Sequence, residues 1–319
     1  MKSKFIESNK AQFNLSFAWL FSIIIGGIIL FFAIYIASQI ISSGERETDA
    51  KLGQEIGVLL NPLETSFQSL QVVPMTLPKE TRIYTSCENS GNFGLQLISV
   101  SQKSFKKWSE PEIQSVFANK YLISKNPSQG EKFYLFSKPF KFPFKVGNLI
   151  YLISAEKEYC FVNSPDSVQQ ELESLEAKNI KYENCSLSEN PKEQIDICFD
   201  LNSGNCEVFV DYSSGYIEKN NSRVYFTDNS LMFAGIFSPK ENYECQVKRL
   251  MKRTASLAQL YISKEDIVSR KGCNSNLDID LSRLGNQALN LEDSRELLNL
   301  YESVEELEIK NKNLECRLW

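Results

Sequence analysis

The 319-residue chain contains no histidine. This absence excludes serine–histidine–aspartate and cysteine–histidine catalysis, and it excludes metal sites that use imidazole ligands. No Cys-x-x-Cys sequence occurs, so the usual spacings of zinc sites and of thioredoxin-like redox sites are also missing. No glycine-rich phosphate-binding loop follows a predicted strand. We therefore expect no enzymatic activity, no metal and no cofactor.

Positive charge is also scarce, with 35 Lys and Arg against 40 Asp and Glu and a net charge of −5. We expect no nucleic-acid partner, because no sustained basic stripe is present. One basic turn, residues 248–253, could bind an acidic partner, but a solvated helix face is the favoured interpretation. The paired carboxylates Asp278 and Asp280, and the cluster Glu305, Glu306 and Glu308, are likewise interpreted as solvated surface.

A long apolar run occurs once, at residues 17–41, with no charged residue inside it. About 20 residues at 1.5 Å of rise span a hydrocarbon core of roughly 30 Å, so this run predicts a transmembrane helix. It is longer than the apolar part of a cleaved secretory signal, which is about 7 to 15 residues. The sequence therefore predicts a retained single-pass anchor, with the lipid bilayer as one partner.

The charges that flank this run predict its orientation. Lysines come before it, whereas mainly acidic residues follow it: Lys2, Lys4 and Lys10 against Glu45, Glu47 and Asp49. Lys and Arg are retained on the cytoplasmic flank. We expect a cytoplasmic N-terminus and an extracellular C-terminal domain.

All eight cysteines follow the apolar run: Cys87, Cys160, Cys185, Cys198, Cys206, Cys245, Cys273 and Cys316. An even number in the outer part predicts disulfides formed in an oxidising compartment. Connectivity stays open, since eight cysteines allow 105 pairings. Cys198–Cys206 is the favoured pair, because residues 202–205 are turn formers and suggest a tight loop between two short strands. Cys316 could be tied to Cys245 or to Cys273.

Two sequons, at Asn184 and Asn220, fit the N-glycosylation acceptor pattern. Chance occurrence in a chain rich in asparagine and serine is the alternative. We retain both positions as possible modification sites.

The pattern along the chain predicts an α+β fold. A cytoplasmic tail, the anchor and a juxtamembrane helix or linker come first, and an ectodomain with a mixed sheet and two long C-terminal helices follows. The expected boundaries are 1–16 for the tail, 17–41 for the anchor, 42–69 for the linker, 70–154 for a β-rich part, 155–240 for an α/β part and 241–319 for a helical part. Apolar residues at helical spacing extend the first helix towards Pro62: Leu52, Ile56, Leu59 and Leu60.

Strand-type segments are predicted at 81–86, 94–100, 132–136, 149–153, 159–162, 180–185, 195–199, 208–212, 223–227 and 231–237. Helices are predicted from residue 164 to about 175, at 242–262 and from 289 to the end. The last helix has apolar residues in steps of three and four, which resembles a short coiled coil. It could form a homo-oligomer or pack against the preceding helix of its own chain.

Phe140, Phe142 and Phe144 alternate with Lys141, Pro143 and Lys145. On an extended chain the three rings share one face. They could form an exposed strip that docks on lipid headgroups or on a protein partner. The favoured alternative is an edge strand whose rings enter the core while its prolines and lysines deter pairing with other chains.

The residues Lys10, Ala11 and Gln12, followed directly by the apolar run, resemble the processing site of archaeal type IV pilin-like proteins. The resemblance implies cleavage between Ala11 and Gln12. Ser16 stands where major pilins carry the glutamate that pairs with the neighbouring subunit during assembly. The whole chain also resembles single-pass, membrane-anchored surface proteins of archaea, a likeness that implies no activity.

These observations favour a non-catalytic, membrane-anchored extracytoplasmic protein. Its disulfide-stapled ectodomain would bind a partner or contribute to the cell envelope. A minor pilin-like subunit of a filament or secretion apparatus is one alternative, and a membrane-anchored enzyme that works without histidine is another.

Overall fold

The computed structural model describes residues 17–65, 72–104, 106–111, 113–182, 194–200, 206–273 and 275–319. The fold is α+β, as predicted, with an apolar N-terminal helix, mixed sheets and C-terminal helices. The chain divides into two compact units, Met1–Glu47 and Thr48–Trp319. Helix α1 (Phe17–Leu59) contributes to both units.

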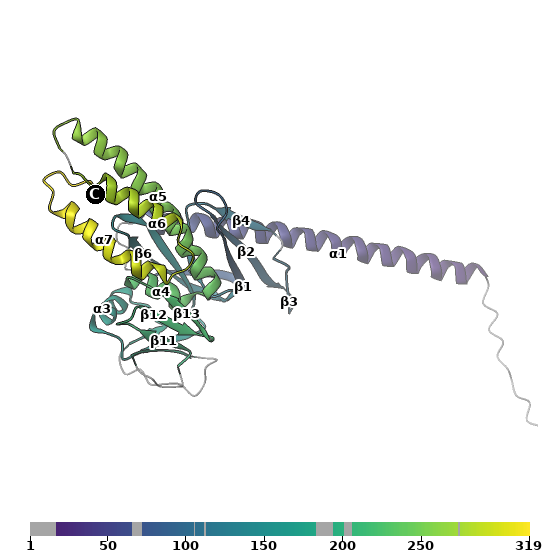
Figure 1. Cartoon of the computed structure of the whole chain (residues 1–319). Coiled ribbons are helices and arrows are strands. Elements are labelled where there is room, and N and C mark those ends of the chain that lie inside the picture. The colour runs from purple at the N-terminus through teal and green to yellow at the C-terminus, as the bar shows by residue number, and fades with distance from the viewer. Residues whose placement is uncertain are drawn as a thin grey trace, which may run out of the picture. The chain divides into compact units, whose positions relative to one another are not determined.

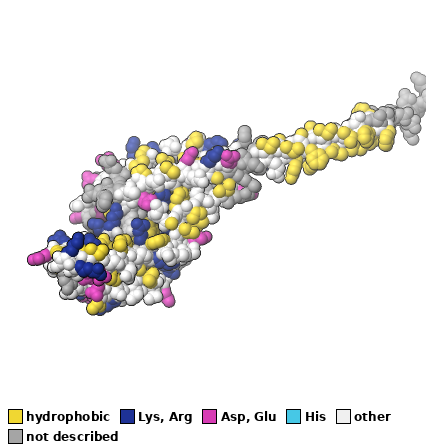
Figure 2. Space-filling model, turned by 90° about the horizontal axis from the view of Figure 1, so that it is seen from above, with side chains coloured by type: hydrophobic (Ala, Val, Ile, Leu, Met, Phe, Trp, Pro, Cys, Tyr) yellow, Lys and Arg dark blue, Asp and Glu magenta, His cyan; other side chains and the backbone are white. Residues whose placement is uncertain are grey.

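The apolar segment of α1 is Trp19–Ile40, with a mean hydropathy of 2.7 over 22 residues. None of this segment is buried, and Figure 2 shows its hydrophobic side chains in yellow along the helix. By length and composition the segment could cross a membrane. A signal sequence near an N-terminus has the same two properties.

The first sheet contains seven strands: β1 (Val73–Glu88), β2 (Leu95–Ser104), β3 (Lys107–Trp108), β4 (Gln114–Phe117), β5 (Tyr121–Ser124), β6 (Ser128–Lys141) and β7 (Lys145–Ser154). Their order is β3-β2-β1-β6-β7-β5, and β4 pairs with β2. Neighbours are antiparallel except β5 and β7, which are parallel. The strands predicted between residues 81 and 153 coincide with parts of β1, β2, β6 and β7.

Side chains from other strands form hydrogen bonds with groups on the outer edge of β5. The Leu122 amide donates to Gln96 Oε1 of β2 at 3.0 Å, and Ser124 Oγ lies 2.8 Å from Thr85 Oγ1 of β1. The Thr85 amide donates to Asn126 Oδ1 at 3.3 Å. The sheet therefore curls until its β5 edge meets β1 and β2, so a strand edge that could pair with another chain is covered.

The last turns of α1 and the short helix α2 (Asn61–Thr65) pack against this sheet. Ile56, Leu60 and Leu63 are buried in one apolar cluster with residues of β1, β2, β5, β6 and β7. The predicted helical spacing is confirmed at Ile56 and Leu60 but is wrong at Leu59, which is 56 % exposed. Burial of this stripe holds the end of α1 on the first sheet.

The second sheet contains six strands: β8 (Glu158–Val162), β9 (Ile180–Lys181), β10 (Gln194–Phe199), β11 (Val208–Asp211), β12 (Tyr216–Lys219) and β13 (Ser222–Tyr225). Their order is β13-β12-β11-β10-β8-β9. Helix α3 (Asp166–Leu175) follows β8 and buries Val168, Leu172 and Leu175. The predicted strand, helix, strand, strand series is confirmed, whereas β12 was not predicted.

The strands next to the Cys198–Cys206 loop were expected to be joined by a tight turn. Instead β10 and β11 are parallel, with Ile197 opposite Val208 and Phe199 opposite Val210. A parallel pair requires the chain to return to the starting end of the first strand, which a two-residue turn cannot do. Residues 202–205, the turn formers on which this expectation rested, lie outside the described residues.

Helix α4 (Asn229–Phe237) replaces the strand predicted at 231–237. It contacts β5, β6 and β7 of the first sheet and β12 and β13 of the second. Eight of its nine residues are buried, so its sequence is apolar on every side and shows no helical stripe. Periodicity alone cannot distinguish such a short buried helix from a buried strand. The Asp228 carboxylate, which accepts from the Leu231 amide at 2.9 Å, sets its N-terminus.

Three helices follow: α5 (Lys240–Ser269), α6 (Asp278–Leu289) and α7 (Glu296–Lys312). Figure 1 shows them side by side, with α6 in contact with both α5 and α7. The prediction of two long helices missed α6 and began the last helix too early. The apolar seam of α7 is buried within the chain at Leu297, Leu300, Val304 and Leu307, so packing within the chain is confirmed over a coiled-coil dimer through this seam.

Candidate functional site

Disulfides connect distant parts of the unit Thr48–Trp319. Cys87 of β1 is bonded to Cys245 of α5, 158 residues away. The predicted pair Cys198–Cys206 is confirmed, and Cys316 is bonded to Cys273, one of its two expected partners. Cys160 is also disulfide-bonded, and Cys185 lies outside the described residues.

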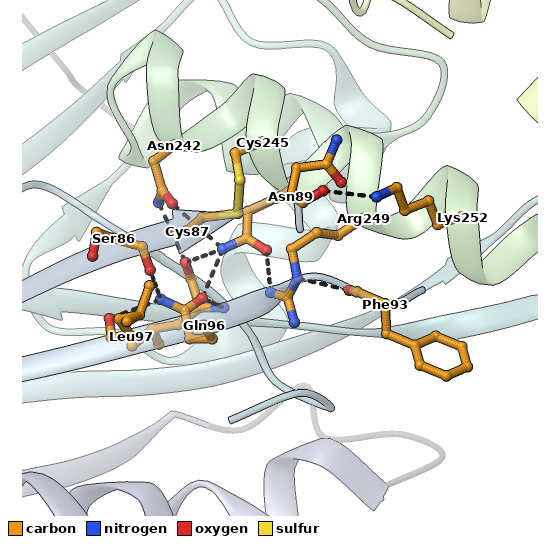
Figure 3. The surroundings of a disulfide bond; sticks show 12 residues. Ser86, Cys87, Asn89, Phe93, Gln96, Leu97, Asn242, Cys245, Arg249 and Lys252 are labelled. Carbon is orange, nitrogen blue, oxygen red and sulfur yellow. Dashed lines mark hydrogen bonds between the residues drawn. A yellow bond between two sulfur atoms is a disulfide. The ribbon is translucent and has the colours of Figure 1, made fainter. Parts of the chain in front are cut away.

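Arg249 occupies the centre of a polar network beside Cys87–Cys245 (Figure 3). Its guanidinium donates to the carbonyl oxygens of Phe93 at 3.1 Å, Ala118 at 2.9 Å and Lys120 at 2.8 Å. Burial lowers the pKa of Arg249 to about 10, so the side chain remains charged at neutral pH. The expectation of a solvated face is wrong for this residue, because the basic turn faces the loops before β2 and β5.

Gln246 extends the same network. Its amide nitrogen donates to Gln96 Oε1 at 2.7 Å, and the Gln96 amide nitrogen donates to the Ser86 carbonyl at 3.0 Å. Lys252 donates to the carbonyls of Asn89 and Gly91 at 2.7 and 2.9 Å. These donors have protein acceptors, so the network holds α5 on the first sheet.

The rings of Phe140, Phe142 and Phe144 are buried, so they do not form an exposed interaction strip. Entry of the rings into the core is confirmed, whereas the predicted edge strand is wrong, because residues 142–144 form the turn between β6 and β7. Phe144 lies 4.7 Å from the Tyr261 ring of α5 and 5.5 Å from the Trp319 ring, measured between centroids. The hairpin of β6 and β7 therefore packs on the helical part of the chain.

A hollow of about 280 Å³ opens where the β11–β12 turn, the start of α4 and α7 meet. We call it the Tyr301 hollow. It is lined by Tyr212, Ser213, Ser214, Gly215, Phe226, Thr227, Asp228, Asn229, Leu298 and Tyr301. Its volume is close to the lower end of the range of roughly 300–1,000 Å³ that is typical of small-molecule sites.

Gly215 allows one wall of the hollow to approach α7. Its φ is +67°, and a Cβ there would lie 2.8 Å from the Phe226 carbonyl oxygen and 3.3 Å from Leu298 Cδ2. The turn before it is held by Asp211, which accepts from Ser213 Oγ and the Ser214 amide. Although burial alone would raise it, these hydrogen bonds lower the pKa of Asp211. Hydrogen bonds to Asp211 therefore hold this turn in one conformation.

Asp228 contributes the one carboxylate among the residues that line the hollow. Burial raises its pKa, against the lowering effect of hydrogen bonds from the Leu231 amide and the Ser230 hydroxyl and of the positive charge of Lys138. Within the described ranges, no lysine or arginine lies at ion-pair distance from Asp228. The carboxylate therefore accepts hydrogen bonds from Ser230 and Leu231, and Lys138 acts on it from beyond ion-pair distance.

Asn229 and Tyr212 connect the hollow to an internal ion pair. The Tyr212 hydroxyl donates to Asn229 Oδ1 at 3.0 Å, and Asn229 Nδ2 donates to Glu171 Oε1 at 3.1 Å. Glu171 is paired with Lys138, which is almost fully buried. These hydrogen bonds therefore fix the orientation of the Tyr212 hydroxyl and of the Asn229 amide.

Tyr301 projects from α7 and is 37 % exposed. Burial raises its pKa, and so do a hydrogen bond with Glu305 and the negative charges of Glu305, Asp228 and Glu308. The groups that act on this phenol are therefore predominantly acidic.

Sequence reasoning did not identify the Tyr301 hollow, because its lining comes from three separate segments, residues 212–215, 226–229 and 298–301, that only the tertiary fold brings together. Of the predicted sites, Asn220 is exposed in the β12–β13 turn with a φ of +49°. Asn184, Ala11 and Gln12 lie outside the described residues. In the described part of the chain, no group of three or more Cys, Asp or Glu is placed to hold a metal ion.

Comparison with known proteins gives no match: no family model, no curated protein and no solved structure is significantly similar to this chain.

Proposed function

We propose that the chain is a single-pass membrane protein whose disulfide-stapled ectodomain binds a small ligand outside the cytoplasm. The observation that carries the proposal is the Tyr301 hollow, a preformed concavity with fixed polar groups in a cross-linked domain. Rigid walls reduce the ordering cost of binding. The proposal assigns no catalytic step to any residue.

Two independent features support the proposed location. The apolar segment Trp19–Ile40 is long enough to span a bilayer, and disulfides persist in oxidising compartments. Lysines before the segment favour a cytoplasmic N-terminus. Protease added to intact cells should therefore digest the ectodomain, and protection equal to that of a cytoplasmic control would contradict the proposed orientation.

Blocking the hollow tests ligand binding directly. Ser213→Trp places a large ring at an exposed position of the lining, whereas Leu260→Trp introduces the same ring at an exposed position on α5 outside it. The full-length protein in a non-ionic detergent would be screened by thermal shift against cations, anions and neutral polyols. Compounds that stabilise the wild type should fail with Ser213→Trp and act normally with Leu260→Trp. Equal effects on both variants would contradict binding in the hollow.

A minor pilin-like subunit is a second candidate. One observation favours it: the helix with the apolar segment continues without interruption to Leu59, and its last turns pack on a sheet. Sequencing of the mature N-terminus separates the two possibilities. A start at Gln12 supports a pilin-type signal, a start at Met1 supports a plain anchor, and a start beyond Ile40 shows a cleaved leader.

A further inference from the structure

The Tyr301 hollow has three aromatic residues and a single carboxylate among its lining residues. The aromatic residues are Tyr212, Phe226 and Tyr301, and the ring centroids of Tyr212 and Phe226 are 6.2 Å apart. The face of an aromatic ring carries partial negative charge, so it attracts a cation placed within about 6 Å. Several rings around one hollow can therefore surround a group such as a methylated ammonium.

The charged residues near the hollow also favour a cation. Asp228 lines the hollow without an ion-pair partner in the described part of the chain, and Glu305 and Glu308 act on Tyr301 at its rim. The nearest buried cation, Lys138, is already paired with Glu171. An anion would meet the carboxylate of Asp228, whereas a cation would be attracted to it.

We propose that the Tyr301 hollow binds a small organic cation of the alkylammonium class. Asp228 is its counter-ion, and the rings of Tyr212 and Tyr301 contact its alkyl groups. This inference rests on the proposed function, because it names the ligand class of the same hollow.

The composition of the hollow disfavours a metal ion as the occupant. Hard divalent cations take six or more oxygen ligands, or octahedral water shells held by carboxylates. Asp228 is the one carboxylate in the lining, which supplies too few oxygen ligands for such an ion. Aromatic faces and one carboxylate are suited instead to a soft, weakly hydrated cation.

Choline and its uncharged isostere 3,3-dimethylbutan-1-ol are the probes, since they differ in charge but hardly in shape. Isothermal titration of the full-length protein in a non-ionic detergent should show saturable choline binding. The isostere should bind at least about tenfold more weakly, consistent with the loss of a partly desolvated cation–π contact.

Asp228→Asn removes the charge and keeps a side chain that is equally suitable as an N-cap, so α4 should stay folded. Asp278→Asn is the matched control, because this exposed carboxylate lies at the start of α6 and does not line the hollow. We expect Asp228→Asn to weaken choline binding at least tenfold and Asp278→Asn to leave it unchanged. Tyr301→Phe should retain binding, and Tyr301→Leu should lose it.

Equal binding of choline and its isostere would overturn the cation assignment while leaving a ligand-binding hollow in place. Choline binding that survives both Asp228→Asn and Tyr301→Leu would overturn the assignment of the site. No choline binding, combined with a polyol or anion response that Ser213→Trp abolishes, would overturn the cation class and support the proposed function. No response to any probe would overturn both.

Discussion

The ammonium group of Lys219 lies 2.9 Å from the carbonyl oxygen of Ile236, and it donates there and to the carbonyl of Gly235 at 2.7 Å. These carbonyls belong to the last turn of α4, where backbone carbonyl oxygens have no N–H donors within the helix. A strand of the second sheet thereby caps a helix that also packs on the first sheet.

This contact predicts a pH dependence of stability. Burial lowers the pKa of Lys219 from 10.5 to about 7, so between these values the unfolded chain binds more protons than the folded one. The contribution of Lys219 to the free energy of unfolding should therefore rise from pH 7 towards pH 10. Urea titrations at pH 7, 8 and 9 would measure it against Lys219→Met, which lacks the titrating group. Lys312→Met, at an exposed position, is the control, and its free energy of unfolding should change with pH as that of the wild type does. The same pH dependence in Lys219→Met would contradict the prediction.

Gly94 predicts a backbone effect. Its φ is +62°, and a Cβ there would lie 2.5 Å from the Glu88 carbonyl oxygen and 2.7 Å from Arg249 Cγ. Gly94→Ala should destabilise the protein by more than the roughly 1–2 kcal/mol expected from a positive φ alone. Gly91→Ala supplies the comparison, because Gly91 has a φ of +65° with open space around it. Denaturant unfolding of both variants measures the difference, and equal losses would show that contact with Arg249 costs nothing.

Arg249 predicts a large and local loss of stability. Arg249→Met should cost about 3 kcal/mol or more, since several buried carbonyls would lose charged donors at once. Arg249→Lys should recover only part of that loss, because an ammonium cannot reproduce the planar fork of the guanidinium. Arg253→Met, in the same basic turn but less buried, is the control and should change stability by less than about 0.5 kcal/mol. Similar midpoints for the two methionine variants would refute this role of Arg249.

The disulfides predict a ranking by loop length. In the chain-entropy description, the 158-residue separation of Cys87 and Cys245 should stabilise by roughly 2.5 kcal/mol more than the 8-residue separation of Cys198 and Cys206. Paired alanine substitutions, Cys87→Ala with Cys245→Ala and Cys198→Ala with Cys206→Ala, would be compared by thermal unfolding. The reverse ranking would contradict the entropic account for this domain.

Local patterns predicted most elements of the fold. The apolar run of α1 and the alternating strands of the first sheet carry their own periodicity, and turn-forming residues around Cys198 indicated its partner. The same reasoning failed for α4, since a helix buried on all sides has no polar face to reveal its period.

Local sequence patterns also failed to predict the burial of Arg249 and the Tyr301 hollow. A positively charged side chain in a helical turn usually faces solvent. The guanidinium of Arg249 is instead buried, where it donates to three backbone carbonyls from distant loops. The lining of the hollow is assembled by a glycine turn, a helix start and a later helix. Neither arrangement has a local signature, because both depend on tertiary contacts.

The Cys87–Cys245 bond also constrains how the disulfide-bonded domain matures. Four other cysteines, Cys160, Cys185, Cys198 and Cys206, lie between these two in the chain. If the chain emerges from its N-terminal end, Cys87 meets each of them before Cys245 arrives, so oxidation in order of appearance produces wrong pairs. Thiol–disulfide exchange must then resolve these pairs through mixed intermediates. The yield of native protein should therefore depend on an isomerase in the compartment where it folds, as well as on an oxidant.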